Sequence, residues 1–333
     1  MPTLNTVTGA RHARIYSVGT YRPKRVVANA EVCELIDSSD EWIRERSGIT
    51  ERRWAGDGES VVFMAAEAAK VAIERAGISP TDIGLIMLGT ISHPYACPSA
   101  SVEVGELIGA RGAPAFDFSA ACAGFCYGVG MAADIIRGGS ATYILVIGVE
   151  RLTDVISKHD RGTAFLFADG AGAVVIGPSE TAGIGPIVWG GDGSQKDAIS
   201  MTASLTDFRD GLVQDFPTVE MAGQQVYRWA VGEMPKATRE ALDIAGITAA
   251  DLDVFIPHQA NNRITDALVR ALDLPENVKI ARDIVTAGNT SAASIPLAMD
   301  AMLQSGEAQS GDTALLIGFG SGLVHAAQVV TLP

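Results

Sequence analysis

"AIERAGISPTDIGLIML" at residues 72–88 and "ALDIAGITAADLDVFIP" at residues 241–257 resemble each other at an offset of 241 − 72 = 169. Each stretch predicts the end of a helix at a glycine, a turn that contains Asp, and a buried strand. The offset is about half of the 333-residue chain. The pair therefore indicates a duplicated α/β unit.

A second pair of segments repeats at nearly the same spacing. Residues 122–139 ("CAGFCYGVGMAADIIRGG") and 290–306 ("TSAASIPLAMDAMLQSG") both predict helices of small and apolar residues, and their offset is 290 − 122 = 168. Helices that are apolar nearly all round are buried. We therefore expect two halves, residues 1–178 and 179–333, with the two helices sandwiched between two sheets. Chance similarity between amphipathic segments is the alternative, which two matches at a consistent offset disfavour.

The composition limits the class of protein. Hydrophobic residues make up 47% of the chain and charged residues 19%, which supports a large core and excludes a disordered or fibrous protein. The net charge of −14 offers no overall basic footprint for nucleic acid. The N-terminus lacks the apolar stretch of a signal peptide, and no run of about 18 apolar residues predicts a membrane span. We expect a cytoplasmic protein that binds neither nucleic acid nor membrane.

The cysteines and histidines do not have the spacing of a metal site. The four cysteines are Cys33, Cys97, Cys122 and Cys126. The last two are separated by three residues, whereas redox and zinc motifs use C-x-x-C. The five histidines are scattered without ligand spacing. A cytosolic chain of this size does not rely on disulfides, so we expect neither a metal site nor a disulfide framework.

A pseudo-twofold axis between the halves would bring together the starts of the two buried helices. Cys122 begins the first, Asn289 precedes the second, and His258 follows a predicted strand at residues 254–256. A helix start lowers the pKa of a thiol from about 8.5, and its free N–H groups stabilise an oxyanion. Singly, each residue has a structural explanation: a core cysteine, a satisfied histidine and a helix cap. Their convergence would favour a nucleophilic site.

Several longer motifs resemble one known family. "DFSAACAGF", "DRGTAFLFADGAGAVVIG", "PHQANNRI", "GNTSAAS" and "GFGSGLVHAAQVV" resemble the ketoacyl-acyl-carrier-protein synthase III family of the thiolase superfamily, with an actinobacterial-type member as the best match. The likeness extends from "SVGTYRP" to the final predicted strand. It implies a five-layered αβαβα thiolase-like fold and a homodimer.

The resemblance also implies a reaction. Cys122 would take an acyl group from acyl-coenzyme A, and malonyl-acyl carrier protein would then lose carbon dioxide. His258 and Asn289 would stabilise the resulting enolate, and the backbone N–H groups of Cys122 and Ser321 would form the oxyanion hole. The product, a 3-oxoacyl-acyl carrier protein, starts fatty-acid synthesis. Acyl-coenzyme A is then a substrate, and no cofactor is expected.

The same resemblance implies binding residues. The adenine of coenzyme A would stack between Trp42 and the guanidinium of Arg161, and Arg46 would contact the phosphates. The alternative for Trp42 is a half-buried surface anchor. The acidic carrier protein would dock on arginines at the tunnel mouth. These are Arg228, Arg263 and Arg270; the alternative is scattered solvated arginines.

Two positions depart from the family pattern. Ser321 stands where many members have Gly, which leaves the backbone donor intact. Cys97 stands where some members place a Phe that reaches across the dimer into the partner's acyl pocket. The smaller side chain predicts more room and favours branched or longer primers. We interpret Cys126 as a packing residue.

Other functions within and outside the superfamily need different residues. Thiolases use a second cysteine in the C-terminal half, elongating synthases use Cys-His-His, and hydroxymethylglutaryl-coenzyme A synthase needs a Glu acid/base that the sequence does not reveal. A priming ketosynthase or an acyltransferase of a polyketide or secondary-metabolite pathway stays open. A non-catalytic acyl-binding subunit is disfavoured by the intact Cys-His-Asn set.

Overall fold

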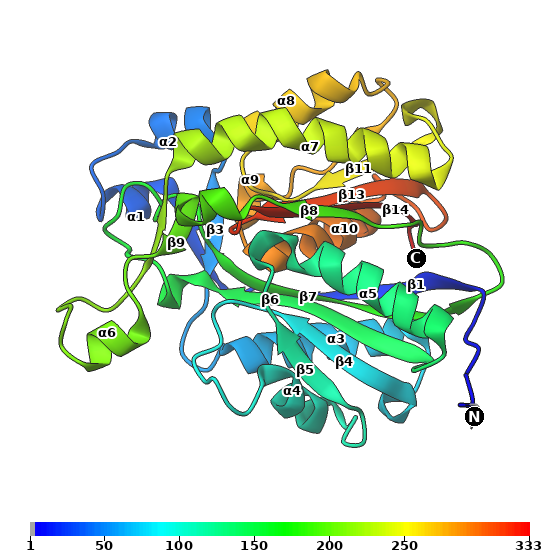
Figure 1. Cartoon of the computed structure of the whole chain (residues 1–333). Helices are drawn as coiled ribbons and strands as arrows, with labels where there is room; N and C mark the ends of the chain where they lie inside the picture. The colour runs from blue at the N-terminus through cyan, green and yellow to red at the C-terminus, as the bar shows by residue number, and fades with distance from the viewer. Residues whose placement is uncertain (1–3) are drawn as a thin grey trace.

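Two five-stranded sheets form the frame of the molecule (Figure 1). The computed structural model describes residues 4–333. The first sheet has the order β1-β7-β6-β4-β5, with β4 parallel to β5 and β6, and β7 antiparallel to β6 and β1. Its strands are β1 (His12–Tyr21), β4 (Ile83–Gly89), β5 (Ala115–Phe118), β6 (Tyr143–Arg151) and β7 (Asp169–Ser179).

The second sheet repeats this arrangement with the C-terminal part of the chain. Its order is β12-β11-β13-β14-β8, and it again joins a parallel side to an antiparallel side. Its strands are β8 (Val188–Gly191), β11 (Val254–Pro257), β12 (Lys279–Ile280), β13 (Thr313–Gly320) and β14 (Val324–Thr331).

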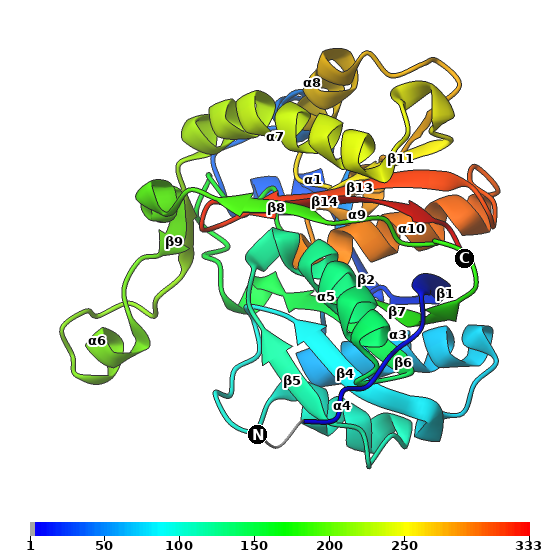
Figure 2. The same ribbon diagram turned by 45° about the vertical axis from the view of Figure 1, so that its right-hand side comes forward.

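Helices complete five layers. Figures 1 and 2 show α5 (Gly124–Gly138) and α10 (Ser294–Ser305) between the two sheets. Helices α3 (Val61–Ala76) and α4 (Ala100–Ile108) cover the outer face of the first sheet, and α7 (Gly223–Ala245) and α8 (Asn262–Leu272) cover that of the second. The predicted sandwich of helices between sheets is confirmed.

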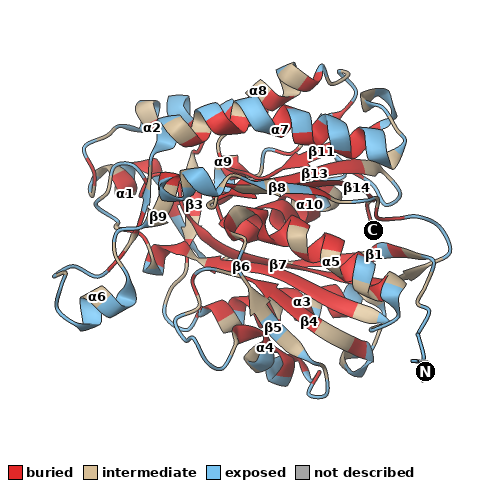
Figure 3. Ribbon diagram, in the orientation of Figure 1, coloured by how far each residue is buried: buried red, intermediate tan, exposed pale blue. Residues whose placement is uncertain are grey.

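Burial explains which helices lie inside. Residues 294–300 of α10 are all buried, and α5 buries most of its small and apolar residues (Figure 3). The outer helix α7 instead has one buried face, as an amphipathic surface helix does. Helix α3 begins where the Ser60 side chain accepts a hydrogen bond from the N–H of Phe63, and it ends at Gly77 with φ of 67°.

The two halves match at an offset of 170 around the central helices. Ala121 and Ser291 both have positive φ, 44° and 48°, and each precedes a buried helix that begins three residues later. The sequence alignment of Cys122 with Thr290 is therefore wrong by two residues. Composition alone could not fix this register, because both segments are runs of small residues.

Shorter elements connect the layers and surround the central helices. Two small antiparallel sheets pair β2 with β3 and β9 with β10. Their strands are β2 (Arg25–Ala28), β3 (Glu51–Trp54), β9 (Ile199–Met201) and β10 (Val219–Met221). The short α-helices are α1 (Asn29–Cys33), α2 (Asp40–Ser47), α6 (Leu205–Arg209) and α9 (Ile284–Ala287). The 3₁₀ turns are η1 (Pro80–Asp82), η2 (Ala121–Ala123), η3 (Leu152–Asp154), η4 (Gly193–Ala198), η5 (Ala249–Asp251) and η6 (Ser291–Ala293). None of the helices within residues 4–333 is both long and apolar enough to span a bilayer.

Candidate active site

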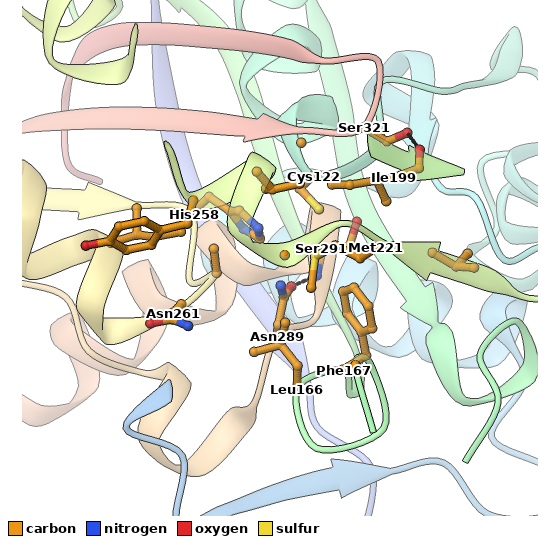
Figure 4. A pocket seen from close by; sticks show the side chains of 18 of the residues that line it. Cys122, Leu166, Phe167, Ile199, Met221, His258, Asn261, Asn289, Ser291 and Ser321 are labelled. Carbon is orange, nitrogen blue, oxygen red and sulfur yellow. Dashed lines mark hydrogen bonds between the residues drawn. The ribbon is translucent and has the colours of Figure 1, made fainter. Parts of the chain in front are cut away.

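A cavity of about 440 Å³ lies where the two central helices begin. Cys122, His258 and Asn289 all line it, although they are far apart in the chain (Figure 4). Cys122 comes from η2, His258 follows β11, and Asn289 lies between α9 and η6. The fold thus brings the three predicted side chains to one space.

Cys122 sits on a tight backbone turn at the start of α5. The preceding residue, Ala121, has a φ of 44°, a conformation that L-residues rarely adopt. The end of β13 lies directly over the cysteine: a Cβ added to Gly320 would lie 2.8 Å from the Cβ of Cys122 and 3.1 Å from its Sγ. Only glycine allows this close approach.

The protonation state of Cys122 corrects a prediction. The helix start was expected to lower the pKa of the thiol. Burial instead raises the pKa of Cys122 to about 12, and the nearby Glu150 carboxylate adds to this, while the Ser291 side chain acts in the opposite direction. The sulfur reaches the cavity, yet protein surrounds it on the other sides, so desolvation of the thiolate outweighs the helix start.

His258 is held in place by a backbone hydrogen bond and by contact of its ring with Phe319. Its N–H donates to the carbonyl of Ile317 at 2.7 Å, and its ring meets Phe319 edge to face at 5.2 Å. Burial lowers the pKa of His258 to about 3. The imidazole is therefore neutral at physiological pH.

The hydroxyl of Ser294 fixes which ring nitrogen carries the proton. Ser294 Oγ lies 2.7 Å from His258 Nδ1 and accepts from the N–H of Gln259 at 3.3 Å. Among residues 4–333, Nδ1 is the only acceptor for the hydroxyl hydrogen. The hydroxyl therefore donates to Nδ1, which leaves the proton on Nε2, the nitrogen without a protein partner.

Asn289 presents a hydrogen-bond donor to the same cavity. Its backbone is fixed on both sides, because its N–H donates to Leu166 and its carbonyl accepts from Ala168, each at 2.9 Å. The side-chain Oδ1 accepts from the N–H of Ser291 at 2.9 Å. This bond directs the oxygen away and leaves the Nδ2 hydrogens free, with no partner in the described part of the chain.

Two backbone N–H groups complete the polar wall. Neither the N–H of Cys122 nor that of Ser321 donates to the backbone of another residue between 4 and 333, and both residues line the cavity. The Ser321 side chain points elsewhere, since its Oγ donates to the carbonyl of Ile199 at 2.7 Å (Figure 4). The arrangement offers one thiol and four N–H donors around one cavity, which suits attack on a carbonyl.

The predicted nucleotide-binding residues lie together at the mouth of the cavity. The Arg161 guanidinium is 4.6 Å from the centre of the Trp42 ring, and that of Arg46 is 5.7 Å from it. Trp42 is half-buried against Phe165, whereas both arginines are exposed. A ring can enter between Trp42 and Arg161 only if the arginine swings outward, which its exposure allows.

Two of the three predicted carrier-binding arginines line the same mouth. Arg228 in α7 and Arg263 in α8 both border the cavity, and Arg263 lies 5.4 Å from the Tyr227 ring. Arg270 is exposed at the far end of α8 and does not border it. Its helical spacing of seven from Arg263 places it about two turns away from the opening.

The comparisons with known proteins agree along the whole chain. Models of 3-oxoacyl-[acyl-carrier-protein] synthase III and of its C-terminal region match residues 116–193 and 242–332. Beta-ketoacyl-[acyl-carrier-protein] synthase III of Streptomyces glaucescens is 56% identical over all 333 residues and the whole of that protein. The mycobacterial synthase III of Mycobacterium tuberculosis is 49% identical and covers 100% of this chain and 99% of its own. This chain belongs to the 3-oxoacyl-[acyl-carrier-protein] synthase III family.

Solved structures give the same result for the fold. The priming β-ketosynthase from the R1128 polyketide pathway superimposes with a TM-score of 0.97 at 45% identity, over 100% of this chain and 99% of that one. Synthase III from Aquifex aeolicus superimposes with a TM-score of 0.89 at 37% identity, over 96% and 99%. The five-layered thiolase-like fold is confirmed, and the chain is an acyltransferase of the condensing type.

Two cysteines lie outside the catalytic space. Cys97 is exposed and does not border the cavity of its own chain, although its neighbours Ala96 and Ser99 border a second cavity of about 590 Å³. Cys126 is buried in the core between the sheets. Within residues 4–333 no group of three His, Cys, Asp or Glu side chains could hold a metal ion.

Sequence reasoning missed three polar residues around the nucleophile: Glu150, Ser291 and Ser294. The two serines stand within "GNTSAAS", and Glu150 ends the apolar run "YILVIGVE". An acidic residue that closes a buried strand is the signal that could have pointed to the site. Sequence reasoning also missed the apolar wall, which is formed by Ile91, Leu152, Ile156, Phe165, Leu166, Phe167, Ile199, Val219, Met221 and Phe319.

Proposed function

We propose that the chain catalyses the decarboxylative condensation of an acyl-coenzyme A primer with malonyl-acyl carrier protein and so starts fatty-acid synthesis. The observation that carries the proposal is one cavity lined by a thiol, a neutral imidazole N–H, a free carboxamide N–H and two free backbone N–H groups. The family membership supports the same reaction.

The first half-reaction transfers the acyl group. Cys122 attacks the thioester carbonyl, and the negative charge that develops on the oxygen is stabilised by the N–H groups of Cys122 and Ser321. Coenzyme A then leaves, and the acyl chain lies against the apolar wall of the cavity. No cofactor takes part in this proposal.

The second half-reaction uses the two side-chain donors. The malonyl thioester loses carbon dioxide, and the enolate oxygen accepts hydrogen bonds from His258 Nε2 and Asn289 Nδ2. Neutral donors suit this step because they stabilise the developing anion without abstracting a proton; loss of one such donor typically reduces the rate about 100- to 1,000-fold. The carbanion attacks the acyl carbonyl on Cys122 and releases the 3-oxoacyl product.

Coenzyme A is proposed to bind along Trp42, Arg46 and Arg161. The half-buried indole and the two exposed guanidinium groups near it support stacking on the adenine and contact with phosphate. Substitution of Trp42 by Ala would then raise the KM for acyl-coenzyme A without changing that for malonyl-acyl carrier protein.

The carrier protein is proposed to dock at Arg228 and Arg263, with Arg270 as an outlying contact. The chain has a net charge of −14, so an acidic partner needs a local basic surface. We predict that Arg228→Ala with Arg263→Ala raises the KM for malonyl-acyl carrier protein about three- to tenfold. Steady-state kinetics in low salt measure this, with Lys70→Ala on the outer helix α3 as the control. An unchanged KM in the double variant contradicts the docking proposal.

The primer is proposed to be branched or longer than acetyl. The support is the small, exposed side chain of Cys97, which stands where some family members place a Phe that reaches into the partner's acyl pocket. A panel of C2 to C6 acyl-coenzyme A donors with malonyl-acyl carrier protein tests both the reaction and the preference. Use of acetyl-coenzyme A alone contradicts the preference, whereas absence of carbon dioxide release with every donor contradicts the condensation.

A homodimer is proposed through the free edge of the first sheet. Within residues 4–333, strand β5 pairs only with β4, and Phe116 in β5 is 40% exposed beside the exposed Tyr95 and Ile91. An uncovered apolar edge strand favours pairing with a second copy. The cytoplasmic location stays a prediction.

The pathway has a second candidate. The likeness to the priming β-ketosynthase of the R1128 polyketide pathway favours a priming role in a secondary-metabolite pathway that uses the same chemistry. Parallel assays with the fatty-acid carrier protein and a polyketide carrier protein of the same host distinguish the two. The carrier with the higher kcat/KM identifies the pathway.

A further inference from the structure

Glu150, at the end of β6, is a buried carboxylate to which the reaction above gives no role. Its side chain is fully buried. One oxygen, Oε2, accepts from Ser92 Oγ at 2.6 Å, from the N–H of Ile91 at 3.1 Å and from Thr90 Oγ1 at 3.2 Å. The other, Oε1, is buried without a hydrogen-bond partner in the described chain. An idle buried carboxylate oxygen is costly, so it calls for an explanation.

The hydroxyl of Ser291 lies between this carboxylate and the nucleophile. Ser291 lines the cavity beside Cys122, and its Oγ is also buried without a partner among residues 4–333 (Figure 4). Its side chain lowers the pKa of both Cys122 and Glu150, because it is close to both groups. In the resting geometry it forms a well-made hydrogen bond to neither. The relay proposed below requires this hydroxyl to turn so that it bonds to both groups.

His258 is badly placed to take the proton of Cys122. Ser294 donates to Nδ1, so Nε2 already carries a hydrogen and has no free lone pair for the thiol proton. Burial also lowers the pKa of His258 to about 3, whereas burial raises the pKa of Glu150 to about 7. Of the two groups, the carboxylate is therefore the much stronger base.

We propose that Glu150, through the Ser291 hydroxyl, accepts the proton that Cys122 loses when it attacks the acyl thioester. The thiol hydrogen passes to Ser291 Oγ, and the Ser291 hydrogen passes to Glu150 Oε1. The sulfur forms a bond to the acyl carbon, and the bond from that carbon to the sulfur of coenzyme A breaks. The proton returns from Glu150 to the departing thiolate, which leaves as free coenzyme A. This inference rests on the proposed acyl transfer and adds its proton acceptor.

The surroundings of Glu150 leave its charge free to change. The titratable groups on the elements packed against it are Cys122 in η2, His93 in the loop after β4, and Asp169 at the start of β7, with Arg151 next to it in β6. None of these forms an ion pair with Glu150 in the part of the chain that the structure describes. The carboxylate is therefore not committed to a structural salt bridge.

Single-turnover acylation of Cys122 tests the proposal. Acyl-coenzyme A is mixed with the enzyme, the reaction is quenched at intervals, and the acylated fraction is read by intact-protein mass. Glu150→Gln keeps an acceptor for Ser92 and Ile91 but cannot take a proton. We expect acylation to slow about 100-fold in Glu150→Gln and in Ser291→Ala. The double variant should be no slower than either single variant, because both changes break one relay.

A conservative variant separates proton transfer from packing. Glu150→Asp keeps the carboxylate and should recover part of the rate that Glu150→Gln loses. Equal loss in both variants, or wild-type acylation in a folded Glu150→Gln, overturns the proposal. If Glu150→Gln does not fold, Ser291→Ala carries the same test, and its wild-type acylation also overturns the relay.

Alkylation of Cys122 by iodoacetamide shows whether a negative result contradicts the proton relay or the proposed acyl transfer. This probe needs the Cys122 thiolate but no acyl donor. Its rate in the wild type should rise through a step near pH 7, and Glu150→Gln should lose that step. A wild type that is not acylated but shows the step contradicts the proposed function alone. A wild type without the step overturns the relay.

Discussion

The thiol of Cys122 and the imidazole of His258 are both neutral at physiological pH. Burial raises the pKa of Cys122 to about 12 and lowers that of His258 to about 3, because the enclosed space stabilises neither the thiolate nor the imidazolium. Charge therefore develops only when a substrate carbonyl offers somewhere to place it. At the scale of single residues, the site is organised by donors that are already aimed at the cavity.

We expect substitutions of Cys122, His258 and Asn289 to slow different half-reactions. Cys122→Ala should abolish acyl transfer, since no other thiol in residues 4–333 borders the cavity. His258→Ala and Asn289→Ala should chiefly slow decarboxylation, by about 100-fold or more, because each removes an enolate donor. Mass spectrometry follows acylation, and release of labelled carbon dioxide follows decarboxylation. Normal decarboxylation in both of the latter variants contradicts their assignment.

Glu150 should make stability depend on pH. Its pKa is raised from an ordinary 4.5 to about 7, so the folded state binds this proton more tightly than the unfolded state. Its stabilising contribution is complete below pH 4.5 and is lost as the pH rises through 7. The loss amounts to about 3 kcal/mol.

The Glu150→Gln variant measures that contribution. Its side chain stays neutral at every pH, so its stability relative to the wild type should increase between pH 5 and pH 8. Urea denaturation of both proteins at a series of pH values gives the difference. A difference that does not change with pH contradicts the raised pKa.

The central helices and the ends of the strands meet by close backbone contact. Gly148 in β6 lies against η6 of the other half, where an added Cβ would come 2.2 Å from the carbonyl oxygen of Ala292. Gly320 in β13 lies against Cys122 in η2 in the reciprocal way. In each half, a glycine in a strand therefore lets the start of the central helix from the other half lie close against the sheet. These contacts determine where the Cys122 thiol lies.

Gly320→Ala should displace that thiol. The added methyl would collide with the Cβ and Sγ of Cys122, and a shift of about 1 Å at a reacting atom can reduce the rate about 100-fold. The acylation rate should therefore fall far more than the melting temperature. Gly232→Ala in α7 is the matched control, because an added Cβ there meets nothing within 4 Å. Acylation at the wild-type rate in Gly320→Ala contradicts the seating of Cys122 by β13.

At the scale of the whole molecule, the first sheet ends in an uncovered strand. We predict that Phe116→Asp on β5 weakens self-association, because it places a charge on an apolar edge. Sedimentation velocity at several concentrations measures the change, with Phe208→Asp on the exposed α6 segment as a control for a surface charge. A wild type that sediments as a monomer at micromolar concentration contradicts the dimer itself.

The two halves, residues 1–178 and 179–333, stay a proposal for the division of the chain. The boundary falls at the end of β7 (Asp169–Ser179), just before the chain crosses toward β8 in the second sheet. The supporting observation is the matching strand order of the two sheets. The cavity takes Cys122 from residues 1–178 and His258 and Asn289 from residues 179–333.

The amino-acid pattern was sufficient for the layered architecture, and it named three residues that the fold brings to one cavity. Repeated helix ends, apolar strands and buried helices are local patterns, so the duplicated layers could be read from them. The family motifs carried Cys122, His258 and Asn289. The register of the second repeat failed by two residues, because runs of small side chains look alike at neighbouring positions.

Tertiary structure alone decided the chemistry of those residues. The direction of the Cys122 pKa shift, the proton on His258 Nε2 and the unpartnered atoms of Glu150 and Ser291 all depend on burial and on neighbours that are distant along the chain. Local sequence patterns carry no measure of desolvation, and a hydrogen bond across the cavity has no signature along the chain. Folding supplies both, because it removes water from groups that only the assembled layers bring together.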